Sequence, residues 1–342
     1  MFADKTVFIV GAGASAEFNL PVGSALMEQI KQNSKFRFEF GEMKEGVHEI
    51  FHVLTRRFKE PAEVNAHLKA MAEISRSIDL AGSIDEFINR HYDDQLIAEA
   101  GKLQIAHAIS KAERESLLAP HKNSDEPILW DNVSTTWIKT FTQMLFEGVR
   151  NEHVEMVGKN ITIVCFNYDR CIEHYLTEAI VKTFRGVDRQ TARKIVEQMK
   201  IIHPYGSLGT LADHPFGAPY TGETLRSMSD NIVTWSESVE SARKAAIEKA
   251  MLSASTLVFL GFAFAPQNMN LLTATQIRDS RTSLEVFATG YGYDNVIDDR
   301  LKNKILNLYS VSGTATSEED IHIQYNMKCA KFIQAHSMAL VA

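Results

Sequence analysis

The segment Thr6-Val7-Phe8-Ile9-Val10-Gly11-Ala12-Gly13-Ala14-Ser15 decides the fold that we predict for this chain. Its first half is an apolar, β-branched run typical of a buried strand. Two glycines follow, and a helical pattern begins at Ser24. This order is typical of a phosphate site, because glycine lets the backbone approach a diphosphate and amides at a helix start point toward it. We therefore expect a dinucleotide ligand. The alternative is a glycine turn that only packs a helix against a strand.

Gly11, Gly13 and Ala16 fit the three small-residue positions of the dinucleotide-binding fingerprint. NAD-dependent dehydrogenases also need a second strand that ends in an acidic residue roughly 20 residues further on. Here Glu28 lies within a helical pattern and we expect no strand after it, so the sequence disfavours hydride transfer. We expect Gly13 to lie against the diphosphate, so that valine at this position removes ligand binding more than it removes stability.

The composition is that of a globular protein. A length of 342 residues predicts two domains, or one large α/β domain with an insertion. The net charge of −7 argues against a broad nucleic-acid-binding surface, which needs clustered lysine and arginine. No apolar run approaches the roughly 20 residues that span a bilayer, so we expect no membrane contact.

The number and spacing of the cysteines bear on whether the chain can hold a zinc ion. Cys165, Cys171 and Cys329 are its three cysteines, and none forms a C-x-x-C pair. A four-cysteine zinc site is therefore excluded, and we expect no metal. An odd number of cysteines without a secretory segment predicts a reducing, cytoplasmic location.

Short apolar segments predict the remaining strands of a parallel sheet. They lie at 161–166, 201–203, 256–260 and 284–287, separated by helical patterns typical of crossover helices. Residues from about 40 to 150 are mostly helical in pattern, with Ser83 as a helix cap. We predict an α/β fold, with a Rossmann-like parallel sheet, flanking helices and a helical insertion module. The predicted domains are residues 1–35 and 155–342 for nucleotide binding, and residues 36–154 for the insertion.

Glycine and polar residues follow four of these strands. After the glycine turn come Asn167-Tyr168-Asp169, then His203-Pro204-Tyr205-Gly206-Ser207, then the segment from Gly261 to Asn268. Ligands bind beyond the carboxyl ends of parallel strands, so we expect these segments to share one crevice. Taken singly, Asn167 and Asp169 have a simpler interpretation as caps of the helix that follows.

These segments resemble the nucleotide-binding motifs of sirtuins, in the same order, over residues 7 to 272. They are most similar to the bacterial sirtuin-like proteins of antiphage defence, which carry segments of the Ser-Ile-Asp-Glu-Phe and Gly-Phe-x-Phe-x-x-x-Asn types, as at 83–87 and 261–268. The resemblance implies cleavage of NAD to nicotinamide and ADP-ribose. It does not imply deacylation, because the chain lacks the paired cysteines of the deacylase zinc module and has no evident acyl-lysine channel. It also implies a homo-oligomer, or a partner protein such as an ATPase.

The resemblance assigns three catalytic residues. Asn167 would orient a water or a ribose hydroxyl, Asp169 would bind ribose or stabilise the developing positive charge, and His203 would accept a proton. The residues assigned to nucleotide binding are Gly11, Ala12, Gly13, Ser15, Pro21, Tyr205, Gly206, Ser207, Gly261, Phe262 and Asn268.

The sequence departs from the family at the catalytic histidine. That histidine directly precedes a glycine, and here the position holds Tyr205, two residues after His203. Both side chains would face the same side if this stretch were extended. The pKa of histidine is about 6.5 and that of tyrosine about 10, so His203 is the better base at neutral pH. The alternative for His203 is a buried, hydrogen-bonded histidine at a strand end. Two other functions stay open: a non-catalytic regulatory module that binds NAD or ADP-ribose, which Tyr205 favours, and an ADP-ribosyltransferase.

Overall fold

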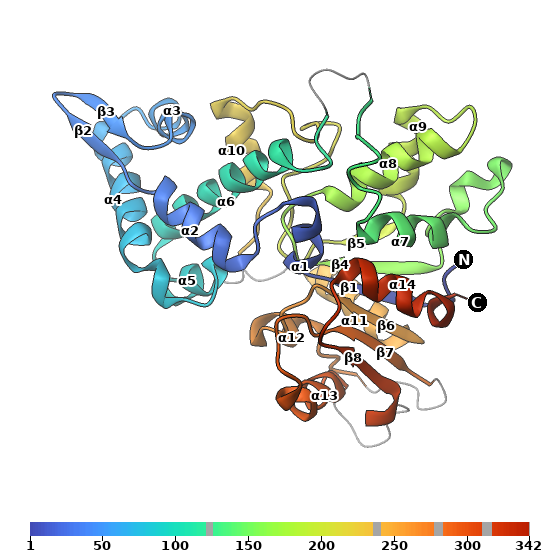
Figure 1. Cartoon of the computed structure of the whole chain (residues 1–342). Coiled ribbons are helices and arrows are strands. Elements are labelled where there is room, and N and C mark those ends of the chain that lie inside the picture. The colour runs from blue at the N-terminus through green and yellow to red at the C-terminus, as the bar shows by residue number, and fades with distance from the viewer. Residues whose placement is uncertain (121–125, 235–240, 277–282, 310–316, 342) are drawn as a thin grey trace.

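The structure is a computed structural model that describes residues 1–120, 126–234, 241–276, 283–309 and 317–341. At its centre is a six-stranded sheet with the strand order β5-β4-β1-β6-β7-β8 (Figure 1). All neighbouring strands pair in parallel, which confirms the predicted parallel sheet. The strands are β1 (Thr6–Val10), β4 (Ile161–Cys165), β5 (Lys200–Ile202), β6 (Thr256–Leu260), β7 (Glu285–Thr289) and β8 (Ile321–Gln324).

Five of the six strands were predicted. β1 and β6 match their predicted segments residue for residue, and β4, β5 and β7 differ by one or two residues at an end. β8 was missed. Its sequence alternates apolar and polar residues, and only its first residue is buried, because it lies at the edge of the sheet.

The strand order reverses between β1 and β6. From β1 the chain builds outward through β4 to β5, and then returns to the other side of β1 to add β6, β7 and β8. This is a Rossmann-like order, and such a reversal leaves a crevice beyond the carboxyl ends of the two central strands. The glycine turn directly follows β1, as predicted, and therefore lies at this crevice.

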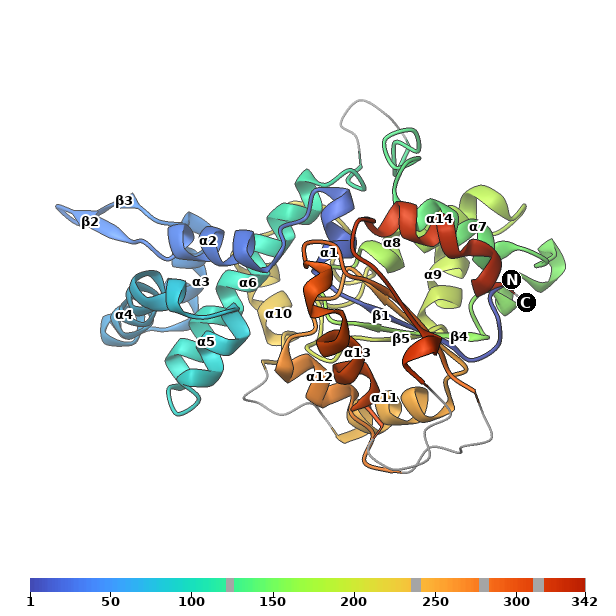
Figure 2. The same ribbon diagram turned by 60° about the horizontal axis from the view of Figure 1, so that its bottom comes forward.

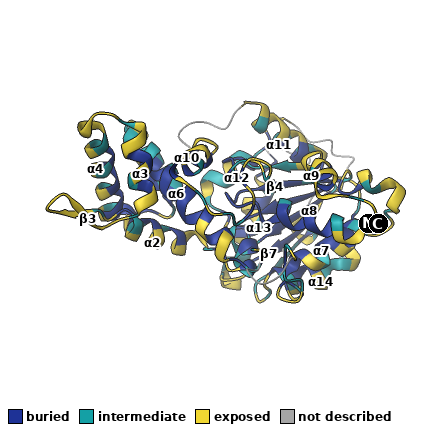
Figure 3. Ribbon diagram, turned by 90° about the horizontal axis from the view of Figure 1, so that it is seen from above, coloured by how far each residue is buried: buried dark blue, intermediate teal, exposed yellow. Residues whose placement is uncertain are grey.

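Helices cover both faces of the sheet (Figure 2). Alternate residues of β1 belong to different cores: Phe8 and Val10 to one, Val7 and Ile9 to the other. All four are buried, in keeping with the dark centre of Figure 3. The helices over Phe8 and Val10 are α7 (Trp137–Phe146), α8 (Cys171–Thr183), α9 (Arg189–Glu197) and α14 (Cys329–Leu340). The helices over Val7 and Ile9 are α11 (Ser241–Ser253), α12 (Pro266–Leu272) and α13 (Asp298–Leu306).

A further group of helices extends to one side of the sheet, at the left of Figure 1. We name this group the helical lobe. It comprises α2 (Gly23–Asn33), α3 (His48–Arg57), α4 (Pro61–Ser77), α5 (Ile84–Arg90), α6 (Gln95–Glu115) and α10 (Gly222–Asp230). The chain enters it after the short helix α1 (Ala12–Ser15), and α10 joins from later in the sequence by packing on α3 and α6. α7 packs instead on α8 and α14, beside the sheet.

The start of α5 and the end of α2 test two local expectations. Ser83 caps α5, because its Oγ accepts the Glu86 N–H at 3.0 Å, as predicted. The expectation that no strand follows α2 is wrong. β2 (Arg37–Glu39) and β3 (Glu42–Glu45) form an antiparallel hairpin, with Phe40 fully exposed between them. This hairpin is not part of the parallel sheet, so the second strand of a dehydrogenase is still missing.

Three findings bear on the expectations drawn from composition. Cys165, Cys171 and Cys329 are all free thiols, and all are buried. Within the described ranges, no three His, Cys, Asp or Glu side chains are grouped so that they could hold a metal ion. No helix among the described residues has the length and apolar character needed to cross a membrane.

Candidate functional site

A cavity of about 430 Å³ lies over the glycine turn, at the carboxyl ends of β1, β6 and β7. We name it the glycine-turn cavity. Its position is the crevice that the strand order predicts, and its size is in the range of small-molecule sites. Four residues assigned to nucleotide binding line it: Ala12, Gly13, Gly261 and Phe262. The full lining consists of residues 12–13, 16–17, 22–23, 261–263, 289, 291–293 and 327–329.

The glycines of the turn are packed against Gly261. Gly261 has a φ of +59°, and a Cβ there would lie 2.1 Å from the Ala14 nitrogen. A Cβ on Gly13 would lie 2.9 Å from the Gly261 oxygen. The Gly13 N–H donates to that oxygen at 2.9 Å, and the Gly11 N–H donates to the Leu260 carbonyl at 3.0 Å. These two amides therefore hold the turn against β6 and are not free to bind a diphosphate.

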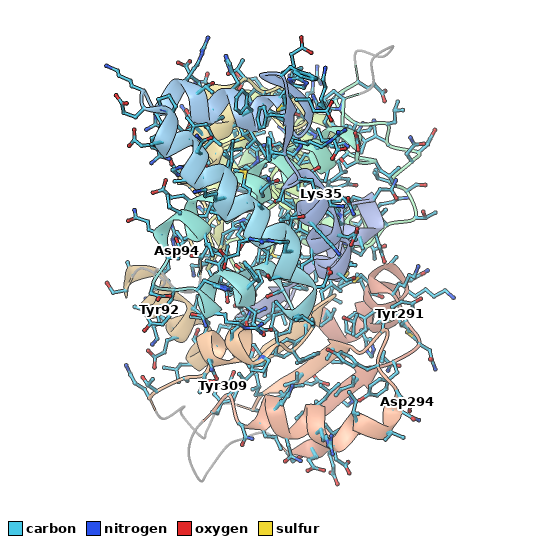
Figure 4. The ribbon with its side chains drawn as sticks, turned by 90° about the vertical axis from the view of Figure 1, so that its left-hand side faces the viewer. Lys35, Tyr92, Asp94, Tyr291, Asp294 and Tyr309 are labelled. Atoms are coloured by element: carbon cyan, nitrogen blue, oxygen red, sulfur yellow. The ribbon has the colours of Figure 1, made fainter. Side chains whose placement is uncertain are left out.

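The charged residues that line the glycine-turn cavity are Glu17 and Lys328. The Glu17 carboxylate accepts the N–H of Trp137 at the start of α7 and the N–H of Ala330 near the start of α14, both at 2.9 Å. The Lys328 ammonium lies 5.5 Å from the centre of the Tyr291 ring. Figure 4 labels Tyr291 in the loop after β7. The Glu17 carboxylate is thus occupied by two helix N–H groups. Lys328 is the cation in the lining of this cavity, and it is the side chain to which an anionic ligand would bind.

Ser15, Asn167 and Asp169 form a buried polar network beside the turn. Asn167 Nδ2 donates to the Gly11 carbonyl at 3.1 Å and to Ser15 Oγ at 2.8 Å. Asp169 Oδ1 accepts the Cys171 N–H at 3.1 Å, at the start of α8. Burial raises the pKa of Asp169, and hydrogen bonds from Cys171 and Ser15 oppose that rise. The structure brings the three side chains together, but they do not line the glycine-turn cavity. Asp169 binds the N–H of the first residue of α8, although the N-cap residue is Arg170.

His203 belongs to a different group of side chains. Its Nδ1 lies 2.9 Å from the Asn167 carbonyl oxygen, and its Nε2 lies 2.7 Å from Glu173 Oε1. Burial favours a lower pKa for His203, but the Glu173 carboxylate outweighs it and raises the pKa above the usual value. Burial favours a higher pKa for Glu173, but the charge and hydrogen bond of His203, together with a backbone hydrogen bond and the charge of Arg170, lower the pKa below its usual value. The two residues thus form an ion pair behind Asn167.

His203 and Tyr205 lie in a turn that spans residues 203–206. β5 ends at Ile202, and the Gly206 N–H donates to the His203 carbonyl at 3.1 Å. The alternation of an extended strand therefore stops before this segment. The expectation that His203 and Tyr205 face the same side is wrong, because His203 contacts α8, whereas Tyr205 contacts Asn268 of α12.

Tyr205 and Asn268 lie together between the sheet and the helical lobe. The Tyr205 hydroxyl donates to Asn268 Oδ1 at 2.8 Å, and its ring centre lies 5.9 Å from that of Phe166. Burial raises the pKa of Tyr205, so the phenol stays protonated. In the same region the Tyr168 hydroxyl donates to Asp85 at the start of α5. This contact ties the helical lobe to the segment that follows β4.

The predicted site residues are thus divided among four places: the glycine-turn cavity, the network around Asn167, the surroundings of His203, and the Tyr205–Asn268 pair. Pro21 lies outside the glycine-turn cavity, although Val22 and Gly23 line it. Gly206 and Ser207 line a second cavity, together with His203. The sequence analysis missed Glu17, Asp85, Glu173 and Lys328. Asp85 lies within a segment that it singled out and Glu17 closely follows the glycine turn, whereas Lys328 follows the strand that it did not predict.

No family model matches the chain, and comparison with curated proteins and with solved structures finds no match either. The class of protein is therefore defined by the fold and the site. The chain is an α/β protein with a six-stranded parallel sheet in a Rossmann-like order, flanked by helices, with a cavity at the point where the strand order reverses.

Proposed function

We propose that the chain is an NAD hydrolase, which binds NAD in the glycine-turn cavity and cleaves the bond between nicotinamide and ribose. One observation carries the proposal: the cavity lies beyond the carboxyl ends of β1 and β6, where the strand order reverses. In α/β sheets of this order, dinucleotides bind at that point.

The lining of the cavity suits the adenosine diphosphate half of NAD. Met327 and Tyr291 offer apolar surface to a base. Lys328 offers a positive charge to the diphosphate, and such charge-assisted hydrogen bonds are about twice as strong as neutral ones. In this proposal Lys328 supplies the phosphate contact that the sequence analysis expected from the glycine turn.

The nicotinamide ribose would then extend along the sheet edge toward Asn167 and Asp169. Loss of neutral nicotinamide, which leaves with the electron pair of the C–N bond, leaves positive charge on the sugar. A water adds at the anomeric carbon and releases its proton to solvent. In the proposal Asn167 orients that water or a ribose hydroxyl, and Asp169 stabilises the positive charge. His203, which the sequence analysis assigned as the proton acceptor, instead positions Asn167 in this proposal, since its Nδ1 lies 2.9 Å from the Asn167 carbonyl oxygen and its Nε2 is held by Glu173.

A regulatory module that binds NAD without turnover is the second candidate. The observation that favours it is Tyr205, in the position of the family's catalytic histidine. Its pKa is raised by burial and its hydroxyl is held by Asn268, so it offers no base at neutral pH.

Free nicotinamide, measured after incubation of the pure protein with NAD, tests the proposal. We expect release by the wild-type chain and a loss of at least about 100-fold in Asn167→Ala, the order of a lost positioned group. Asn160→Ala is the matched control. Asn160 precedes β4 as Asn167 follows it, and its Nδ2 also donates to a backbone carbonyl, that of Phe2, at 2.5 Å.

The outcomes separate the candidates. Near-normal turnover by Asn167→Ala removes Asn167 from the mechanism. NAD binding without nicotinamide release favours the regulatory module. Labelled ADP-ribose bound covalently to protein indicates a transferase. If the chain neither binds NAD nor releases nicotinamide, all three functions are contradicted.

A further inference from the structure

A second cavity of about 330 Å³ lies at the open edge of the sheet, between β5, α8 and α9. We name it the edge cavity. The lining residues that matter here are Arg170, Glu173, Arg193 and His203. No residue lines both this cavity and the glycine-turn cavity, so the two are separate sites.

Arginine side chains give the edge cavity a positive side. Arg193 on α9 lines it, and the Arg193 Nε is buried with no hydrogen-bond partner among the residues that the structure describes. Arg170 also lines the cavity, but its guanidinium is held by Glu113, with the closest nitrogen and oxygen 2.5 Å apart. Because a guanidinium group matches phosphate in shape and charge, Arg193 is the donor suited to an anionic ligand.

Glu173 gives the cavity an acceptor. Its Oε1 lies 2.7 Å from His203 Nε2, whereas its Oε2 is buried and has no partner within the described part of the chain. A carboxylate oxygen accepts hydrogen bonds only, so its natural complement is a hydroxyl or amino group. The cavity therefore combines a donor for an anion with an acceptor for a hydroxyl.

We propose that the edge cavity binds a small phosphorylated sugar, with its phosphate on Arg193 and a sugar hydroxyl donating to Glu173 Oε2. The cavity volume is in the range of small-ligand sites. This site does not depend on NAD cleavage. His203 connects it to the end of β4, because its ring contacts both Glu173 and the Asn167 carbonyl.

Calorimetric titration of the full chain with ribose 5-phosphate and with inorganic phosphate tests this site. We expect saturable binding of both, with ribose 5-phosphate the tighter. Arg193→Gln should weaken both by at least tenfold, since it removes a charge-assisted contact. Glu173→Gln should weaken ribose 5-phosphate several-fold and leave inorganic phosphate unchanged.

Two control variants keep the test specific. Lys194→Gln removes the same charge from the neighbouring, exposed position of α9 and should leave both affinities unchanged. Ala263→Phe fills the glycine-turn cavity and should leave them unchanged as well. No saturable binding to the wild-type chain overturns the proposal. So does an equal loss in Arg193→Gln and Lys194→Gln, or a loss caused by Ala263→Phe.

Discussion

Gly13 and Gly261 need to lack a side chain because their backbones contact each other. The sequence predicts a glycine that makes room for a diphosphate, but the Gly13 N–H is bound to Gly261, and their backbones are in contact. The absent side chain makes room for another strand end. A glycine turn in a sequence cannot separate these two roles, because both need the same missing Cβ.

We expect Gly13→Val to lower the free energy of unfolding by about 3 kcal/mol, because overpacking at a rigid backbone contact has costs of this order. Ala16→Val is the control, since Ala16 lines the same cavity and has a helical φ of −60°. It should cost less stability while placing the same methyl groups near the ligand. Denaturant unfolding of both variants checks this. A Gly13→Val chain that unfolds normally but fails to bind NAD would restore the diphosphate interpretation.

At the scale of elements, Glu17 joins the glycine turn to two helices. One carboxylate caps α7 and α14, which follow it by more than a hundred residues and pack against each other on one face of the sheet. A negative charge at a helix N-terminus satisfies free N–H groups and interacts favourably with the helix dipole.

Glu17→Gln should lower the free energy of unfolding by about 1–3 kcal/mol, because the amide NH₂ cannot accept the N–H that it would face. Glu28→Gln, on the exposed side of α2, is the matched control and should change it by less than about 0.5 kcal/mol. Urea unfolding of the two variants measures the difference. Equal effects would show that the double cap contributes nothing.

The elements that could be predicted are those whose signal is local. β1 and β6 are continuous apolar runs because they are buried on both faces, and Ser83 marks the start of α5 through its own hydrogen bond. The hairpin at 37–45 and β8 lack such signals, because exposed or edge strands bury little. The turn after β5 decides where His203 points, and a partner 30 residues away, Glu173, decides what it contacts. Neither is visible in the local pattern.

At the scale of the whole molecule, the chain places one helical lobe beside a sheet whose strand order reverses at its centre. Hydrogen bonds connect the two parts near the Tyr205–Asn268 pair: Tyr168 to Asp85, and Gln267 to Ser83 at 3.4 Å. The two ends of the chain lie side by side, since the Ala3 N–H donates to the Leu340 carbonyl at 3.0 Å (Figure 1). The glycine-turn cavity, at the reversal, is where this architecture predicts a dinucleotide.

Calorimetric titration of NAD into the wild-type chain, Ala263→Phe and Ala335→Phe tests that claim most directly. Ala263 is exposed and lines the glycine-turn cavity, whereas Ala335 is exposed on α14 outside it. We predict saturable binding to the wild-type chain and to Ala335→Phe, and at least a tenfold loss of affinity in Ala263→Phe, because the phenyl ring would occupy ligand space. Equal affinity in all three chains, or no binding to the wild-type chain, would contradict the account.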